Sequence, residues 1–400
     1  MTLKLSRSEW KCVTLGQVAT ASKEKVDPGD GSVERFVAGE HMDSDDLKIH
    51  RWGNIGEVDL GPAFHRRFHP GQVLYGSRRT YLRKVAVADF DGVCANTTFV
   101  AETKDPNILL QDFLPFIMTS QGFQAFAIAE SKGSVNPYVN WSDLERFEFN
   151  LPPVDVQERL AGLLWAVEWQ ARSSADVRMQ TSAVRSLWFE TALRTGKTTK
   201  GWDVRPVTDV VTAGPTNGKS VTANDEARGV PTLSISAIRD GKVLGGKAVK
   251  YIDVPPADVA NFVIEPDDFL VVRGNGNKQL TGRGGLAVGG LPDGCVYPDL
   301  LIRLRFDPAL ILPEFGAAQW NSAWAHNALI KKAKSTNGIW KINGKDIRSH
   351  QLIVPPIDDQ RKLLLKLETL DNAIDLLDLE SSALAVLRAS LLSEIFGGQS

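Results

Sequence analysis

The sequence predicts a mixed α/β (α+β) protein in which two globular blocks alternate with two long coiled-coil helices. Three observations support this fold class. One segment occurs twice without gaps, a long helix with a heptad pattern follows each copy, and the remaining stretches have the short apolar runs of strands between turns. We therefore expect an internal tandem duplication, with boundaries at 1–151, 152–196, 197–354 and 355–400.

The repeated segment comprises residues 139–160 and 342–363, and apolar residues match apolar residues between the identical ones. The identical pairs are Asn140/Asn343, Asp143/Asp346, Pro152/Pro355, Pro153/Pro356, Asp155/Asp358, Gln157/Gln360 and Leu160/Leu363. An ungapped match of this kind indicates duplication, and its period is too long for a solenoid repeat.

Each copy predicts a short strand that stops at two prolines and is followed by a helix. Phe149 and Leu151 alternate with polar residues, which is the pattern of a half-buried strand. The prolines stop strand pairing and disfavour helix before them. Asp155 and Asp358 then stand where helix N-caps are expected, and Glu158 completes a capping box in the first copy.

Both predicted helices carry a seam with alternating steps of four and three residues, as in a coiled coil. In the second helix, at about 357–396, the seam is Leu363, Leu367, Leu370, Ile374, Leu377, Ser381, Leu384, Leu387/Arg388, Leu391 and Ile395. In the first, at about 155–195, it is Leu160, Leu164, Val167, Ala171, Ser174, Val177, Gln180, Val184 and Leu187. We expect the helices to end at Gly397-Gly398 and Gly196 and to pack against each other. The alternative is that each packs only on its own block.

The two globular blocks have the texture of mixed α/β units. Short apolar runs between turn residues predict strands at 72–75, 84–89, 269–272 and 300–304. Helical stretches are expected near 110–129 and 313–332. Each block opens near a tryptophan, Trp10 or Trp202, yet their sequences differ far more than the junctions do.

Composition limits the classes of function. The 46 basic and 48 acidic residues leave a net charge of −2, which excludes coating of nucleic acid by bulk charge but not local basic patches. Residues 353–400 hold four basic against eight acidic side chains, so the second helix is a poor surface for DNA. Three scattered cysteines, no apolar leader and no 18-residue apolar stretch predict a cytoplasmic chain without disulfides or a membrane span. His65 and His69, the one close histidine pair, have no nearby cysteine, and we expect no metal site.

Together these features resemble the specificity subunit of type I restriction–modification systems. The resemblance rests on the tandem blocks that begin near a tryptophan, the junctions Leu-Pro-Pro-x-x-x-Gln at 151–157 and Val-Pro-Pro-x-x-x-Gln at 354–360, and the leucine-rich helices. It implies that 1–151 and 197–354 are target recognition domains, each for one half of an asymmetric bipartite target in double-stranded DNA. It also implies that the helices pair antiparallel as a ruler and dock two adenine methyltransferase subunits, which bind S-adenosylmethionine. The resemblance leaves open whether a restriction subunit joins them to make the endonuclease.

The sequence lacks the motifs of an adenine methyltransferase, although a Ser-His-Asp or Cys-His set stays open. Asn136-Pro-Tyr138 lacks the second proline of the Asp/Asn-Pro-Pro-Tyr motif of adenine methyltransferases, and the glycines at 274–285 do not form Gly-x-Gly-x-x-Gly. We therefore expect a non-catalytic subunit without a cofactor of its own. The alternatives are a specificity-like DNA-binding scaffold of another defence or methylation assembly, and a fused DNA-modifying enzyme with diverged motifs.

Two pairs of loops are candidate DNA contacts, because phosphates and base edges are bound by Lys, Arg, Asn, Gln and small donors. The pairs are 76–84 with its counterpart 273–283, and 131–136 with its counterpart 334–338. The candidate residues are Arg78, Arg79, Tyr81, Arg83, Lys84, Lys132 and Ser134 in the first block, and Arg273, Asn275, Asn277, Lys278, Gln279, Arg283, Lys334 and Asn337 in the second. The alternative is that these loops are ordinary solvated turns.

Overall fold

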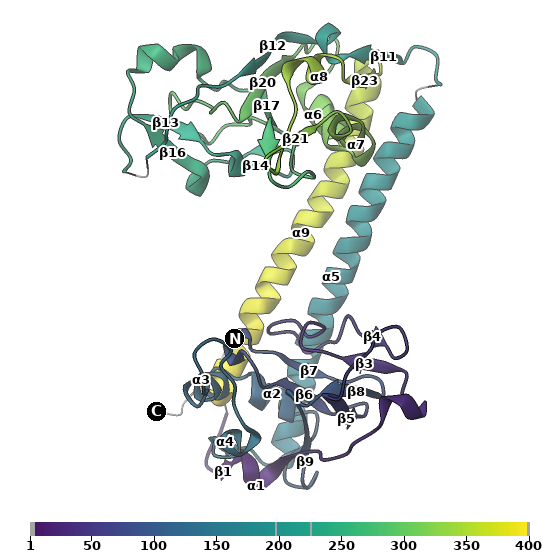
Figure 1. The fold of residues 1–400 in the computed structure, drawn as a ribbon, viewed down its shortest axis with the longest axis vertical. Helices are drawn as coiled ribbons and strands as arrows, with labels where there is room; N and C mark the ends of the chain where they lie inside the picture. The colour runs from purple at the N-terminus through teal and green to yellow at the C-terminus, as the bar shows by residue number, and fades with distance from the viewer. Residues whose placement is uncertain (1–4, 197, 225, 398–400) are drawn as a thin grey trace. The chain divides into compact units, whose positions relative to one another are not determined.

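A computed structural model of the chain describes residues 5–196, 198–224 and 226–397 (Figure 1). It forms two compact units, here called unit 1 (Met1–Asp176 with Asp378–Ser400) and unit 2 (Val177–Leu377). Each unit contains one globular block and one end of each long helix. Residues 1–4 and 197 of the expected blocks, and 398–400 with the expected helix stop at Gly398, lie outside the described residues.

Unit 1 contains two four-stranded sheets and a separate strand pair. The first sheet is antiparallel, in the order β2 (Ala19–Ala21), β9 (Thr98–Thr103), β6 (Val73–Gly76) and β7 (Val85–Val87). The second is β4 (Gly53–Asn54), β3 (Arg35–Val37), β8 (Gly92–Ala95) and β5 (Phe64–Phe68), in which β3 and β8 are parallel. The pair is β1 (Lys11–Thr14) with β10 (Glu148–Leu151). The helices are α1 (Leu15–Val18), α2 (Leu114–Thr119), α3 (Gln121–Ala129) and α4 (Trp141–Leu144).

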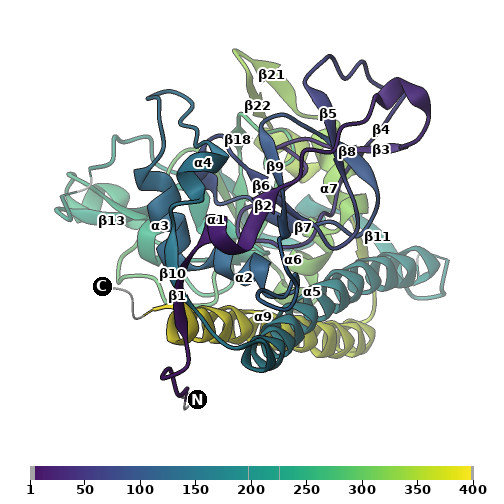
Figure 2. The same ribbon diagram turned by 90° about the horizontal axis from the view of Figure 1, so that it is seen from below.

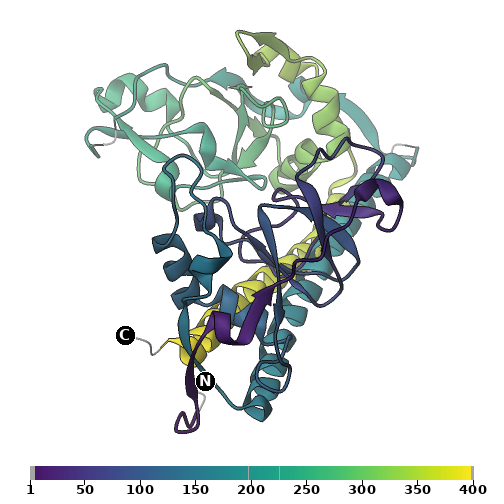
Figure 3. The ribbon, with the colours of Figure 1, turned by 60° about the horizontal axis from the view of Figure 1, so that its bottom comes forward.

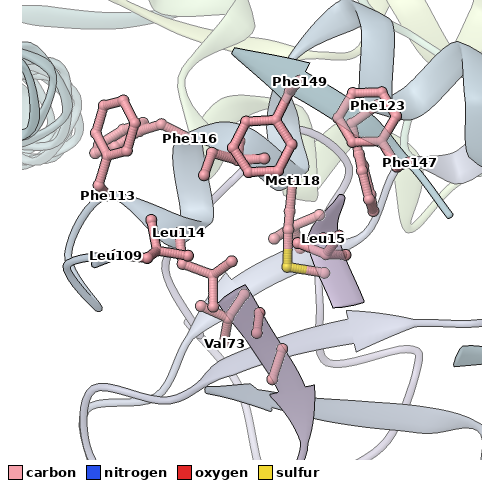
Figure 4. Packing of buried hydrophobic residues seen from close by; sticks show 14 of the residues in the cluster. Leu15, Val73, Leu109, Phe113, Leu114, Phe116, Met118, Phe123, Phe147 and Phe149 are labelled. Atoms are coloured by element: carbon pink, nitrogen blue, oxygen red, sulfur yellow. The ribbon is translucent and has the colours of Figure 1, made fainter. Parts of the chain in front are cut away.

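The main core of unit 1 lies between the first sheet, the helix pair α2–α3 and the long helices. Val73 of β6 and Leu15 of α1 contribute aliphatic side chains, and Phe116 and Phe123 fill the space beside them (Figure 4). The rings of Phe123 and Phe147 meet edge to face, with centroids 5.2 Å apart. The helical stretch expected near 110–129 is present as two short helices, α2 and α3. Their apolar residues pack into this core.

Unit 2 is built around a six-stranded sheet in the order β12 (Val211–Asn217), β20 (Leu301–Phe306), β17 (Asp268–Val272), β19 (Gly284–Leu286), β15 (Lys242–Val243) and β14 (Ile238–Arg239). Smaller sheets are β13 (Val230–Leu233) with β16 (Val249–Ile252), β11 (Asp203–Pro206) with β23 (Gln351–Val354), and β18 (Gly274–Asn275) with β22 (Ile339–Lys341) and β21 (Lys334–Thr336). The helices are α6 (Pro313–Asn321), α7 (Ala323–Ile330) and α8 (Gly344–Arg348). Buried Phe269, Phe315 and Trp320 centre its core.

The long helices are α5 (Val154–Gly196) and α9 (Ile357–Phe396), and they pair antiparallel. In unit 1 Glu168 pairs with Arg388, and the Ser174 hydroxyl donates to Glu380 at 2.9 Å, so numbers rise along one helix as they fall along the other. Figure 2 shows the two helices side by side, and Figure 3 shows the last turns of α9, in yellow, beside the rest of unit 1. The alternative in which each helix packs only on its own block is wrong.

The expected seam of α5 is correct only in its first half. Leu160 through Ser174 follow it, but Val177, Val184 and Leu187 are 45%, 56% and 70% exposed and Gln180 is also exposed, so these predicted seam positions are wrong. The strict alternation of four and three passes through exposed Arg178 and then through Thr181, Arg185, Trp188 and Ala192, which are half-buried. In unit 2 Arg185 forms a two-bond ion pair with Asp371 of α9. By apolar character alone, Val184 would be assigned to the seam. The helix instead keeps the heptad register, which places Arg185 and its ion pair with Asp371 in the seam.

The expected caps at Asp155 and Asp358 are also wrong. Both helices begin one residue earlier, and the carbonyl groups of Pro153 and Pro356 accept the first helical hydrogen bonds. Proline has the φ of a helix already fixed, so the helix starts directly after it. Asp155 lies in the first turn, where its carboxylate pairs with Arg159 at 3.3 Å and faces the positive end of the helix dipole.

Candidate nucleic-acid interface

The repeated glutamine of each junction fastens the long helix to the globular block. Gln157 is fully buried; its amide donates to the carbonyl groups of Ile108 and Pro152, both at 2.8 Å, and its oxygen accepts from the Leu110 amide at 2.9 Å. Gln360, equally buried, makes the same three bonds in unit 2, at 2.8–2.9 Å, with Leu310, Pro355 and Leu312. Both anchors hold the segment that leads into the helix pair of the block.

The repeated Asn and Asp form a capping box on a short helix that begins a few residues after the second candidate loop. In unit 1 these residues are Asn140 and Asp143 on α4, and in unit 2 they are Asn343 and Asp346 on α8. A capping box satisfies otherwise unpaired amide groups at a helix start. The C-terminal end of the loop is therefore held at an equivalent, capped helix start in both copies.

In unit 1 the two candidate loops lie edge to edge. The backbone of Ser77 accepts from the Val139 amide at 3.0 Å, the Arg79 amide donates to the carbonyl of Pro137 at 2.6 Å, and Lys132 and Tyr138 exchange two hydrogen bonds at 2.8–2.9 Å. Segments separated by more than fifty residues in the sequence thus form one surface.

The cations on this surface differ in availability. Arg78 lies over the ring of Tyr138, with its guanidinium carbon 6.0 Å from the ring centroid. Arg79 is exposed, and we find no ion-pair partner for it among residues 5–196, 198–224 and 226–397. The side chains of Tyr81, 53% exposed, and Ser134 also face solvent.

Three other predicted cations of unit 1 are engaged within the protein. Arg83 pairs with Asp45, and the Lys84 ammonium donates to the carbonyl of Gly39. Burial and the neighbouring Arg79 lower the pKa of Lys84. Lys132 contacts both carboxylate oxygens of Asp143, at 2.8 and 3.1 Å, and this pair lowers the pKa of Asp143. These cations hold the loops in shape, and DNA would have to compete for them.

In unit 2 the corresponding loops also meet, but as a small sheet. Strands β21 and β22 form a hairpin, and β18 pairs with the other edge of β22 through Gly274 opposite Lys341 and Asn275 opposite Trp340. Figure 2 labels the three strands. The Ile342 amide donates to the carbonyl of Arg273 at 2.9 Å and fixes the hairpin at its base.

Some side chains of the loop after β18 shape the turn, and others lie against a ring or face solvent. Asn275 and Asn277 each accept from a backbone amide two residues on, at 2.8 and 2.9 Å, and so shape the turn. The Lys278 ammonium lies 4.3 Å from the centre of the Trp340 ring. Gln279 is exposed.

Both arginines of this loop are held by the fold. Arg273 donates to the carbonyl of Asp299 at 3.3 Å. Arg283 donates to the carbonyl of Asn321 at 2.7 Å, and burial lowers its pKa. On the hairpin, by contrast, Lys334 and Asn337 are exposed.

Three further residues belong to these surfaces and were not predicted from the sequence, namely Tyr138, Ile339 and Lys341. Lys341 is exposed on β22 directly opposite Lys334. The dipeptide Asn337-Gly338, with φ of 52° and 75°, is the usual signal of a two-residue hairpin turn and points to strands on either side of it. That signal would have brought residues 339–341 into the predicted site.

The described residues include no group of three or more His, Cys, Asp or Glu side chains arranged to hold a metal ion. None of the helices described is long and apolar enough to cross a membrane.

The fold is that of the S subunits of type I restriction–modification systems. The S subunit of M. genitalium superposes with a TM-score of 0.61 at 16% identity over the whole of both chains. A chain solved in work on complex assembly and conformational transition of the type I R-M system superposes with a TM-score of 0.61 at 20% identity, over 99% of this chain and all of that one.

Among curated proteins, the chain is similar to the specificity subunit of the type I restriction enzyme EcoKI of Escherichia coli K12, with 30% identity over 187 residues. It is also 28% identical over 153 residues to the EcoDI specificity subunit of Escherichia coli. The matches cover 46% and 38% of this chain but only 40% and 33% of those relatives. No model of a protein family matches the chain. The resemblance predicted from the repeated junctions is thus confirmed.

Proposed function

We propose that this chain is the DNA sequence-recognition subunit of a type I restriction–modification complex. It binds an asymmetric bipartite target in double-stranded DNA and catalyses no reaction itself. The observation that carries the proposal is the same in both units: two loops far apart in sequence meet on one surface that carries exposed cations or amides. The exposed groups are Arg78 and Arg79 in unit 1, and Lys334 and Asn337 in unit 2.

The two surfaces differ in chemistry, and this supports two different half-sites. Unit 1 presents guanidinium groups beside Tyr138, a combination suited to guanine edges and phosphates. Unit 2 presents lysines, amides and Ile339 on a hairpin. A target bound by both is therefore asymmetric.

The long helices supply the proposed docking surface for two adenine methyltransferase subunits, which bring S-adenosylmethionine. In unit 1 Trp169 is 62% exposed and stacks on Trp165, beside a surface pocket of about 450 Å³ that Arg172 also lines. Two guanidinium nitrogens of Arg172 are buried without a hydrogen-bond partner in the described structure. Apolar side chains of a methyltransferase subunit would cover the indole rings.

Sequencing of methylated bases in cells with and without this gene tests the proposal. A bipartite methyladenine motif should vanish on deletion and return with the wild-type gene. A motif that persists would exclude this role and favour a scaffold of another assembly. Methyl transfer or DNA cleavage by the purified chain alone would instead favour a fused enzyme.

The docking surface has its own test. Trp169→Ser should weaken co-purification of the methyltransferase subunit, whereas Trp52→Ser, at an exposed tryptophan of the globular block of unit 1, should leave it unchanged. Equal loss in both variants would contradict docking at Trp169.

A further inference from the structure

The hairpin β21–β22 of unit 2 has an unfavourable charge arrangement. Lys334 lies directly opposite Lys341 in the antiparallel register, both are exposed, and neither has an ion-pair partner among the described residues. Like charges directly opposite on a sheet destabilise it. A pair of this kind is stabilised when an anion lies across it.

The hairpin is supported from one side only. Side chains alternate between the two faces of a strand, so Trp340 and Ser335 share one face, while Lys334, Lys341 and Ile339 share the other. Lys278 covers Trp340 on the first face, at 4.3 Å. The opposite face carries two cations and an apolar side chain, Ile339, that is 41% exposed.

The dimensions of the hairpin suit a groove of DNA. A major groove about 12 Å wide admits a two-stranded β-ribbon, whose strands lie about 4.8 Å apart. The tip is a tight Asn337-Gly338 turn with both φ positive, so the ribbon ends without a bulky loop.

We propose that the hairpin β21–β22 enters the major groove of the half-site bound by unit 2. Lys334 and Lys341 contact phosphates at the groove edge, and the Asn337 amide at the tip contacts the edge of an adenine. Ile339 packs on the methyl group of a neighbouring thymine. An Asn amide matches the donor and acceptor of adenine, and an apolar side chain matches the thymine methyl. The inference rests on the proposed function and assigns an A·T-dependent contact to unit 2.

Among its described residues, unit 1 has no equivalent ribbon. Its corresponding loop is closed by Lys132 and Tyr138, contains Pro137 and lies against Arg78 and Arg79. Variants of Arg78 and Arg79 therefore serve as an internal reference for the other half-site.

The test uses the complex of the full chain with its methyltransferase partner and duplexes that carry the methylated motif. Lys334→Gln with Lys341→Gln removes the repulsion, so the variant should fold. It should bind all duplexes more weakly and lower the slope of log affinity against log salt by about 2, since each phosphate contact contributes about 0.9. Lys247→Gln, at an exposed lysine outside the hairpin, should leave the slope unchanged.

Asn337→Gly keeps the positive φ of the turn and removes only the amide. It should lose roughly tenfold discrimination at one A·T pair of the unit 2 half-site and none in the other half-site. Unchanged salt slope and unchanged discrimination in these variants, while Arg78→Ala with Arg79→Ala still loses its half-site, would overturn the hairpin contact and leave the proposed function standing. A wild-type complex without sequence-specific binding would overturn both.

Discussion

The two junctions of this chain are alike down to single hydrogen bonds, whereas the two loop surfaces are built differently. Gln157 and Gln360 make the same three contacts, and both short helices begin with the same capping box. The loops share only their topology: unit 1 closes a loop over an arginine pair, and unit 2 forms a hairpin. A duplicated module thus keeps the bonds that join helix to block, while the exposed surface is free to differ.

The largest expected effect concerns the buried glutamines. Gln157→Ala and Gln360→Ala each remove three hydrogen bonds and leave a buried amide unpaired, which should lower the free energy of unfolding of the unit by about 4 kcal/mol. Denaturant unfolding, with hydrogen exchange at the Leu110 and Leu312 amides, measures it. Gln180→Ala, at an exposed position of α5, should change stability by less than about 0.5 kcal/mol. Unequal costs at the two glutamines would show that the junctions are not equivalent.

A pH effect should distinguish the two units. Burial, with repulsion from Lys332, lowers the pKa of His350 to about 4, while the matching position of unit 1 is Phe147. Because this pKa lies below that of an unfolded histidine, the stabilisation is present above about pH 6.5 and is lost as the pH falls toward 4. Unit 2 should lose about 3 kcal/mol over this range.

The reciprocal substitutions test this pH effect. His350→Phe should remove most of the acid sensitivity of unit 2, and Phe147→His should introduce it in unit 1, as followed by hydrogen exchange between pH 7 and 4. Retained sensitivity in His350→Phe would assign it to another group.

The loop surfaces should act on separate half-sites. Arg78→Ala with Arg79→Ala should cost about 2 kcal/mol of binding free energy at one half-site and leave the other unchanged. Gln279→Ala with Asn337→Gly should do the reverse. Competition binding with duplexes altered in one half at a time measures both. Equal weakening on every duplex would identify these residues as phosphate contacts only.

The smallest effect is expected on the exposed side of α5. Leu187→Gln should change the free energy of unfolding by less than about 0.5 kcal/mol, because this side chain is outside the seam. Leu367→Ala, at a buried position of α9, should cost about 3 kcal/mol. Similar costs in thermal or denaturant unfolding would place Leu187 back in the seam.

Periodicity and repetition predicted the long helices, the junctions and several strands but not the sheets they form, and local composition predicted where the loops lie. The strands at Val73–Gly76 and Asp268–Val272 and the two long helices follow from patterns within a few residues of each position. The partners of individual side chains do not. Arg83 and Lys132 looked equally available in the sequence, but Asp45 and Asp143, the groups that engage them, come from other segments. The error in the predicted seam of α5 has the same origin, since Arg185 pairs with Asp371, which lies on α9.

Because α9 is divided between the units, the unit that begins first during synthesis is the one that is completed last. The core of unit 1 includes Leu391, Leu392 and Ile395 from the last turns of α9, although its other buried residues lie before position 177. Unit 2 has all of its residues once position 377 has been made. The ribosome therefore begins unit 1 first but completes unit 2 first. Until the final turns emerge, the core of unit 1 lacks Leu391, Leu392 and Ile395.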